Sequence, residues 1–215
     1  MTAIPCRGLL FDSDGVLVDS DASVALSWSR WARHRGFDPE HVTGLVHGRR
    51  SADTVALLVP EAERAEALAR VNRFEVEDAA GVTACPGAAE LLRGLPHMAW
   101  AVVTSGVRAL AEARLTAAGL PKPAVLVTAD DVVEGKPAPE GYRRAAALLG
   151  LPAGDCLVLE DSVAGAAAGR AAGARVLGVS SRALDSDADL VVADLRGVRF
   201  DGTAVHVADD AVLRR

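Results

Sequence analysis

Six short, continuous apolar runs constrain the fold of this chain more than any other feature. They are GLLF (8–11), AWAVV (99–103), AVLV (124–127), CLVL (156–159), ARVLGV (174–179) and DLVV (189–192). Runs without polar alternation are typical of parallel strands covered on both faces. Ala/Leu-rich segments that end before a glycine lie between them, at 107–118, 139–149 and 163–172. Because a glycine just past a helix is a common C-cap, the alternation predicts a doubly wound α/β sheet.

The region from about 16 to 84 interrupts this alternation, because it carries no strong strand signal. Residues 21–35 place Val24, Trp28, Trp31 and Ala32 on one helical face. Residues 61–78 form a second, charged and Ala-rich helical stretch. We therefore expect two parts: a sheet core formed by residues 1–15 and 85–215, and a small α-helical insertion formed by residues 16–84.

Composition limits the partners and the location of the chain. Its 215 residues are 50% hydrophobic with a net charge of −6, so we expect no nucleic-acid partner. The N-terminus lacks a signal-like apolar region, and no apolar run is long enough to span a membrane. Three widely spaced cysteines (Cys6, Cys85 and Cys156) are expected to be buried thiols in a reducing compartment. We therefore expect a cytoplasmic protein without a membrane partner; the oligomeric state is left open, and a monomer is compatible with the sequence.

Polar residues follow four of the predicted strands, directly at three of the strand ends and, for Lys136, within the following stretch DDVVEGKPAP. They are Asp12 and Asp14; Thr104, Ser105 and Gly106; Lys136; and Glu160 and Asp161. In an open α/β sheet, ligands bind at the carboxyl ends of the strands, so these side chains are expected to share one site.

This set of residues suits phosphoryl transfer. Clustered carboxylates favour a hard divalent cation such as Mg²⁺, and a hydroxyl–glycine turn at a helix start can hold phosphate oxygens. Lys136 adds a positive charge. One aspartate can then attack phosphorus, and a second, two residues on, can act as acid and base. Each motif alone is compatible with an ordinary turn or helix cap, so the prediction depends on the order and the placement of all four.

The motifs FDSDGVLVDS, VVTSG, GKPAPEGY and VLEDSVAG resemble, in order, the four motifs of the haloacid dehalogenase-like hydrolase superfamily. The resemblance implies a Rossmann-like core, with Asp12 as the nucleophile that forms an aspartyl-phosphate and Asp14 as the acid/base. It implies that Mg²⁺ is held by Asp12, the Asp14 backbone carbonyl and Asp161, with Glu160 a ligand or a support for the ligands. Thr104 and Lys136 would bind the transferring phosphoryl group, together with Ser105 and Gly106.

The helical insertion resembles the small helical cap of this superfamily, which closes over small substrates. Within it, HGRRSADTV (47–55) resembles the cap loop that contacts the non-phosphate part of the substrate. We therefore expect Gly48, Arg49 and Arg50 to contribute to substrate binding, with His47 a weaker candidate; surface arginines in solvent are the alternative.

Particular residues distinguish the branches of this superfamily. Asp14 argues against true dehalogenases, and the absence of lysine between residues 16 and 84 disfavours the Schiff-base phosphonatases. A β-phosphoglucomutase-like phosphomutase is the main alternative, but residues 19–30 lack the cap histidine that such mutases usually carry. A non-catalytic phosphometabolite sensor is disfavoured by the intact aspartate pair. The sequence most resembles bacterial sugar and sugar-alcohol phosphate phosphatases, so a Mg²⁺-dependent hydrolase acting on a small phosphorylated metabolite is predicted.

Overall fold

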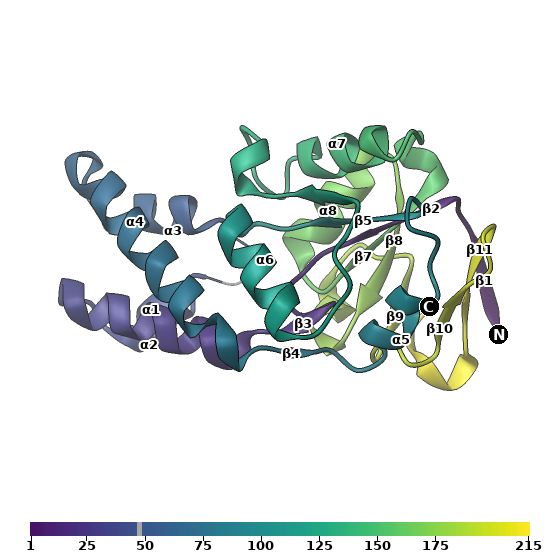
Figure 1. Ribbon diagram of the computed structural model, residues 1–215, viewed down its shortest axis with the longest axis horizontal. Helices are drawn as coiled ribbons and strands as arrows, with labels where there is room; N and C mark the ends of the chain where they lie inside the picture. Colours follow the sequence, from purple (N-terminus) through teal and green to yellow (C-terminus); the bar gives the residue numbers. More distant parts are fainter. Residues whose placement is uncertain (47–48) are drawn as a thin grey trace.

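A seven-stranded sheet forms the centre of the computed structural model, which describes residues 1–46 and 49–215 (Figure 1). Its strand order is β12-β9-β8-β7-β2-β5-β6, and each neighbouring pair is parallel except β12 with β9. The strands are β2 (Gly8–Phe11), β5 (Trp100–Val103), β6 (Val125–Val127), β7 (Cys156–Glu160), β8 (Arg175–Val179), β9 (Leu190–Val192) and β12 (Val212–Arg214). The six apolar runs of the sequence correspond to β2 and β5 to β9, so the predicted parallel sheet is confirmed.

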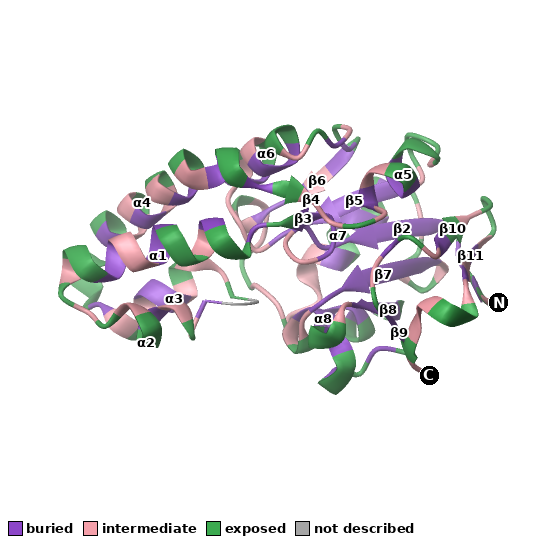
Figure 2. Ribbon diagram, turned by 90° about the horizontal axis from the view of Figure 1, so that it is seen from below, coloured by how far each residue is buried: buried purple, intermediate pink, exposed green. Residues whose placement is uncertain are grey.

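Helices cover both faces of this sheet, as a doubly wound fold requires. They are α5 (Ala88–Arg93), α6 (Arg108–Ala117), α7 (Glu140–Leu148) and α8 (Val163–Ala172). Along β2, Leu9 and Phe11 pack in the cluster that contains α5 and α6 side chains, whereas Leu10 packs in the cluster that contains those of α7 and α8. Both faces of the central strands are therefore buried (Figure 2), which explains their continuous apolar sequence.

Helix α8 approaches the sheet closely because two of its residues are glycines. A Cβ added to Gly169 would lie 3.1 Å from Val158 of β7, and one added to Gly165 would collide with the Glu160 carboxylate. The repeated glycines in VAGAAAGRAAGA thus bring the helix close to the strand that carries the site acids.

The helical part of the chain lies at the end of the molecule opposite to the two termini (Figure 1). It contains α1 (Asp21–Arg35), α2 (Pro39–Thr43), α3 (Ser51–Leu58) and α4 (Glu61–Glu77). Trp28 and Trp31 of α1 are fully buried in a separate apolar cluster, as the predicted helical face requires, and the Trp31 indole donates a hydrogen bond to the Ala67 carbonyl. Helices α2 and α3 were not predicted; α3 begins at Ser51, so the second half of the expected cap loop 47–55 is helical.

Two short strands connect the helical part to the sheet, where the sequence had indicated no strand. They are β3 (Val18–Asp19) and β4 (Thr83–Ala84), which pair antiparallel with Val18 opposite Ala84. The chain thus leaves and re-enters the sheet side by side, close to the predicted boundaries at 16 and 84. We call the helical part, residues 16–84, the cap; its boundaries stay a prediction.

The sequence also did not predict a small antiparallel sheet at the end of the molecule that carries the termini. It consists of β1 (Thr2–Pro5), β11 (Ala204–Val207) and β10 (Val198–Phe200). Short 3-10 helices complete the fold: η1 (Asp78–Gly81), η2 (Ala129–Asp131), η3 (Ala153–Asp155), η4 (Ser181–Asp185) and η5 (Asp209–Ala211).

The three cysteines are free thiols, and only Cys85 is partly exposed. Burial raises the pKa of Cys6 and Cys156 to about 11 and that of Cys85 to about 12. All three thiols therefore stay protonated at neutral pH, as expected for small packing groups. Over the described residues, every helix is too short or too polar to cross a membrane.

Candidate active site

The carboxyl edge of the sheet brings together an aspartate, a lysine and a glutamate from three different segments. The Lys136 Nζ atom lies 2.7 Å from the Asp12 Oδ1 atom and 2.6 Å from the Glu160 Oε1 atom. The ammonium also donates to the Val103 carbonyl, at the end of β5. Since the Lys136 side chain is only 8% exposed, these contacts are largely shielded from water. The predicted convergence of Asp12, Lys136 and Glu160 is therefore present.

Three carboxylates form a compact oxygen cluster at this edge. One carboxylate oxygen each from Asp12, Glu160 and Asp161 lies within 4.8 Å of the others. Such a set of hard oxygen donors, carrying more negative charge than Lys136 neutralises, fits a divalent cation such as Mg²⁺.

Glu160 differs from the two aspartates because both of its oxygens are already occupied. Its Oε1 atom accepts hydrogen bonds from Lys136 and from the buried Tyr142 hydroxyl, and its Oε2 atom accepts from the Ser162 backbone and side chain. Glu160 is fully buried. This geometry suits a residue that holds Lys136 and the start of α8 in place better than a direct metal ligand.

Burial and the neighbouring negative charges raise the pKa values of the aspartates in the site. Burial raises the pKa of Asp12 well above its ordinary value, opposed by Lys136 and reinforced by Glu160 and Asp161. Burial and Glu160 raise the pKa of Asp161 to about 7. For Lys136, burial alone would lower the pKa, but Asp12 and Glu160 outweigh it and raise the pKa above 10.5. The lysine therefore stays charged, and the aspartates need a further positive charge to ionise fully.

Gly15 explains why a glycine follows the two aspartates. Its backbone has a φ of +79°, a conformation that side-chain-bearing residues rarely adopt. A Cβ at this position would lie 2.0 Å from the Asp161 Oδ2 atom. The turn after β2 can therefore pass directly against Asp161 only because residue 15 lacks a side chain.

The hydroxyl–glycine turn after β5 leads into helix α6. The Thr104 side chain is buried, and its Oγ1 atom accepts a hydrogen bond from the Gly106 backbone at 3.0 Å. Ser105 and Gly106 line the same cavity as Asp12 and Lys136. The turn is thus placed where the sequence predicted a cradle for phosphate oxygens.

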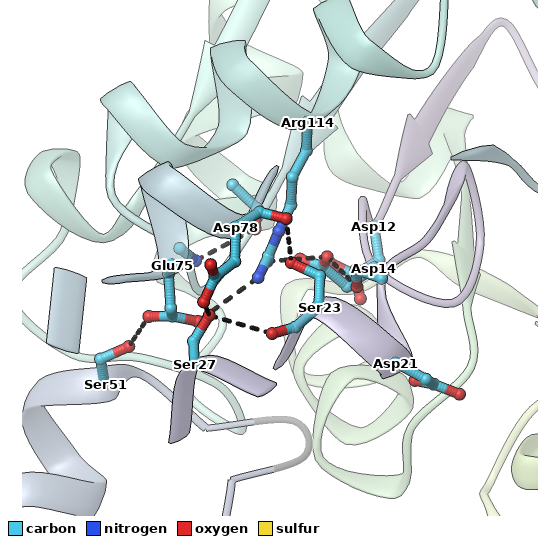
Figure 3. A network of polar contacts seen from close by, with 12 residues as sticks. Asp12, Asp14, Asp21, Ser23, Ser27, Ser51, Glu75, Asp78 and Arg114 are labelled. Atoms are coloured by element: carbon cyan, nitrogen blue, oxygen red, sulfur yellow. Dashed lines mark hydrogen bonds and ion pairs between the residues drawn. The ribbon is translucent and has the colours of Figure 1, made fainter. Parts of the chain in front are cut away.

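Asp14 occupies the other side of the site and contacts residues that the sequence did not single out (Figure 3). Its Oδ1 atom accepts hydrogen bonds from the Ser20 hydroxyl at 2.5 Å and from the Arg114 guanidinium at 2.8 Å. Arg114 lies on α6, and its guanidinium also lies 3.4 Å from Glu75 on α4 of the cap. The contacts of Arg114 with Asp14 and Glu75 depend on how α6 docks against α4, two helices that are far apart in the sequence. No local sequence pattern could therefore identify Arg114 or Glu75 as part of the site.

A cavity of about 700 Å³ lies between the core and the cap. The core lines it with Asp12, Asp14, Ser105 and Lys136, among others; the cap contributes residues including Arg49, Ser51 and Glu75. This volume is typical of a site for a small molecule.

The predicted cap residues have different positions. Arg49 lines the cavity, whereas the Arg50 guanidinium is bound to the Asp53 carboxylate and to the Val133 carbonyl of the core. Gly48 and His47 lie outside the described residues. Substrate roles for these residues stay predictions.

Comparison with known proteins identifies the class to which this fold and site belong. The family described as haloacid dehalogenase-like hydrolase matches residues 6–173, which contain all four strand-end motifs. The chain belongs to this family, as the sequence motifs predicted.

Three relatives make the similarity more specific. Hexitol phosphatase A of Escherichia coli (strain K12) is 43% identical over 83% of this chain and 85% of its own length. Glycerol-1-phosphate phosphohydrolase 2 of Saccharomyces cerevisiae (strain ATCC 204508 / S288c) is 34% identical over 93% of this chain and 87% of its own length. The crystal structure of a hydrolase from Pseudomonas syringae matches with a TM-score of 0.78 at 27% identity, covering 88% of this chain and 94% of that one. The chain is therefore an enzyme of the phosphatase type within its family.

Proposed function

We propose that the protein is a Mg²⁺-dependent phosphatase that hydrolyses small sugar or polyol phosphate esters through an aspartyl-phosphate on Asp12. The observation that carries this proposal is the placement of Asp12 at the end of β2, paired with Lys136 and adjacent to Asp161. Relatives named for hexitol and glycerol-1-phosphate hydrolysis support the substrate class.

In the first step, an Asp12 carboxylate oxygen attacks phosphorus, and the bond from phosphorus to the ester oxygen breaks. Asp14 gives its proton to that oxygen, so the product leaves as an alcohol. Lys136 and the turn at Thr104, Ser105 and Gly106 hold the phosphoryl oxygens. Lys136 suits this task because it is buried and remains charged.

In the second step, a water molecule attacks the aspartyl-phosphate, and its proton passes to the Asp14 carboxylate. The phosphorus–Asp12 bond breaks, inorganic phosphate is released and both aspartates return to their starting states. The cap over the cavity limits access by bulk water and by large substrates.

We propose that Asp12, Asp161 and the Asp14 backbone carbonyl hold Mg²⁺, with Glu160 as a support. When bound, Mg²⁺ supplies positive charge that offsets the clustered carboxylates and the charge of the transferring phosphoryl group. The raised pKa values of Asp12 and Asp161 support the need for such a charge.

The test is release of inorganic phosphate from a panel that includes hexitol, hexose and glycerol phosphates. Wild-type protein should be active with Mg²⁺ and inactive with chelator, and Asp12→Asn should reduce turnover to the chelator level. Asp185→Asn, which alters an exposed carboxylate in η4, is the control and should keep wild-type activity. Full activity of Asp12→Asn would exclude this mechanism.

The same panel separates hydrolysis from phosphoryl transfer between sugars. A phosphomutase would convert a sugar 1-phosphate into its 6-phosphate, when a bisphosphate is supplied, faster than it releases phosphate. We expect phosphate release to dominate.

A further inference from the structure

Arg114 is a buried cation that the proposed chemistry does not use. It lies on α6, outside the four strand-end motifs, and its side chain is only 4% exposed. A buried guanidinium is costly unless it is paired, so its partners indicate why it is there. Both of its charged partners line the catalytic cavity.

The first partner is Asp14, the proposed acid/base. Arg114 Nη1 and the Ser20 hydroxyl both donate to the same Asp14 oxygen, Oδ1. Among the described residues, the other oxygen, Oδ2, has no donor, so it is the one available for proton transfer. Two donors on one oxygen fix the rotation of the carboxylate and thereby aim the second oxygen.

The second partner, Glu75, belongs to the cap. Its side chain is 5% exposed, and its Oε1 atom lies 3.4 Å from Arg114 Nη2. Its Oε2 atom accepts a hydrogen bond at 2.9 Å from Ser51, the first residue of α3. Glu75 of α4, held in turn by Ser51 of α3, therefore accepts from the guanidinium on one side while Asp14 accepts on the other (Figure 3).

We propose that Arg114 is a positioning residue that aims Asp14 for proton transfer only while Glu75 of the cap is docked against it. This inference rests on the proposed function, because it assigns Asp14 the acid/base role. Glu75 lies on α4 of the cap, whereas Arg114 and Asp14 belong to the core. If the cap separates from the core, Arg114 must therefore lose its contact with Glu75 or, if its side chain follows Glu75, its contact with Asp14. Closure of the cap is thereby linked to the orientation of the acid.

Substrates with different leaving groups distinguish a role of Arg114 in positioning Asp14 from a merely structural role. An alkyl phosphate such as a glycerol or hexitol phosphate needs a proton on its departing oxygen, whereas 4-nitrophenolate leaves readily as an anion. The measurement is release of the leaving group in a single turnover, with Mg²⁺ and with enzyme in excess, so that only the first step is observed.

Arg114→Met should slow alcohol release by about 10²-fold, because small misplacements of a reacting group have effects of this size. Nitrophenolate release should fall by less than about threefold, with the same half-saturating concentration of enzyme. Glu75→Gln should show the same selectivity with a smaller loss, and Arg114→Lys should recover part of the alcohol release. Thermal unfolding of each variant identifies any that fails to fold, in which case Glu75→Gln and Arg114→Lys still carry the test.

Two matched controls should behave as wild type. Glu77→Gln changes an exposed ion pair made from the same helix as Glu75, and Arg170→Met on α8 removes the exposed ion pair between Arg170 and Asp189. Equal losses with both esters, or unchanged alcohol release in Glu75→Gln, would overturn the proposal. Asp12→Asn tests the proposed function separately from the role of Arg114. If this variant still releases nitrophenolate normally, Asp12 is not the nucleophile, whatever the Arg114 variants do.

Discussion

At the scale of single residues, the site depends on close approaches that only particular side chains allow. Asp12 and Asp161 follow the neighbouring parallel strands β2 and β7, and the turn after Asp14 passes directly against the Asp161 carboxylate. Gly15 makes that turn possible, since a Cβ there would lie 2.0 Å from Asp161.

We expect Gly15→Ala to abolish activity and to weaken stabilisation by Mg²⁺. The backbone strain alone should lower the free energy of unfolding by about 1–2 kcal/mol. Gly119→Ala is the matched control: Gly119 also has a positive φ, +64°, but a Cβ there meets nothing within 4 Å. Denaturant unfolding should show the strain in both variants, and phosphate release should fall in Gly15→Ala alone; equal activity of the two variants would contradict this explanation.

The residues that the sequence could and could not identify differ in what fixes their positions. Asp12 and Asp161 directly follow buried strands, and the parallel sheet alone brings those strand ends together, whereas Lys136 follows β6 through a loop that returns it to the same edge. Arg114, Glu75 and Tyr142 lie within helices, where periodicity indicates a face but not the side chain opposite. Their role became visible only with the docking of α4 on α6 and of α7 on the sheet.

At the scale of elements, the cap has its own packing, centred on α1. Trp31 is fully buried, with its ring 5.5 Å from that of Trp28 and 5.8 Å from that of Phe37. Its indole nitrogen also donates to the Ala67 carbonyl of α4. One side chain thus fixes α1 against α4, which carries Glu75.

Trp31→Ala should lower the free energy of unfolding by about 3–5 kcal/mol, because it leaves a large cavity and an unpaired carbonyl. Leu26→Ala on the same helix should change it by less than about 0.5 kcal/mol, since Leu26 is 51% exposed. Urea unfolding monitored by helical circular dichroism measures both. Similar costs for the two substitutions would show that α1 is not held by this cluster.

Prediction of the elements succeeded where burial on both faces or a wide apolar helical face makes the pattern strong. The run 8–11 coincides with β2, and 21–35 coincides with α1. The missed strands are short and incompletely covered: β11 is AVHV with two of its residues buried, and β12 is VLR with none fully buried. Strand β11 also needs the distant β1 as a partner, and β12 is only three residues long, so no local pattern distinguishes them from loops.

At the scale of the whole molecule, the buried acids of the site make the stability of this protein, which carries a net charge of −6, dependent on pH. The pKa of Asp161, raised to about 7 by burial, lies above its ordinary value of 3.8. Between these two pH values the metal-free folded state binds a proton that the unfolded state has lost. Stability from this group is therefore present at low pH and is lost as the pH rises through about 7.

Because metal ligands must be deprotonated, we expect Mg²⁺ to raise the melting temperature more at about pH 8 than at about pH 5.5. In a chain of this size, about 1 kcal/mol corresponds to roughly 2–4 °C, so the difference is measurable by thermal unfolding. Asp161→Asn should remove most of it, whereas Asp185→Asn should not. A Mg²⁺ effect that is independent of pH in the wild-type protein would argue against Asp161 as a ligand.

The paired strands β3 and β4 have a consequence for how such enzymes diversify. Val18 and Ala84 lie opposite one another, so the two ends of the cap are held at one fixed backbone separation. The cap is therefore joined to the sheet at the same two points, β3 and β4, whatever the number of residues between them. We expect a cap from a relative with other substrate preferences to be transplantable between Asp19 and Thr83, provided that it keeps a glutamate at the position of Glu75 to pair with Arg114. Substrate range can then change with little effect on the reaction chemistry, because the cap joins the core at two fixed junctions and needs to preserve only its contact with Arg114.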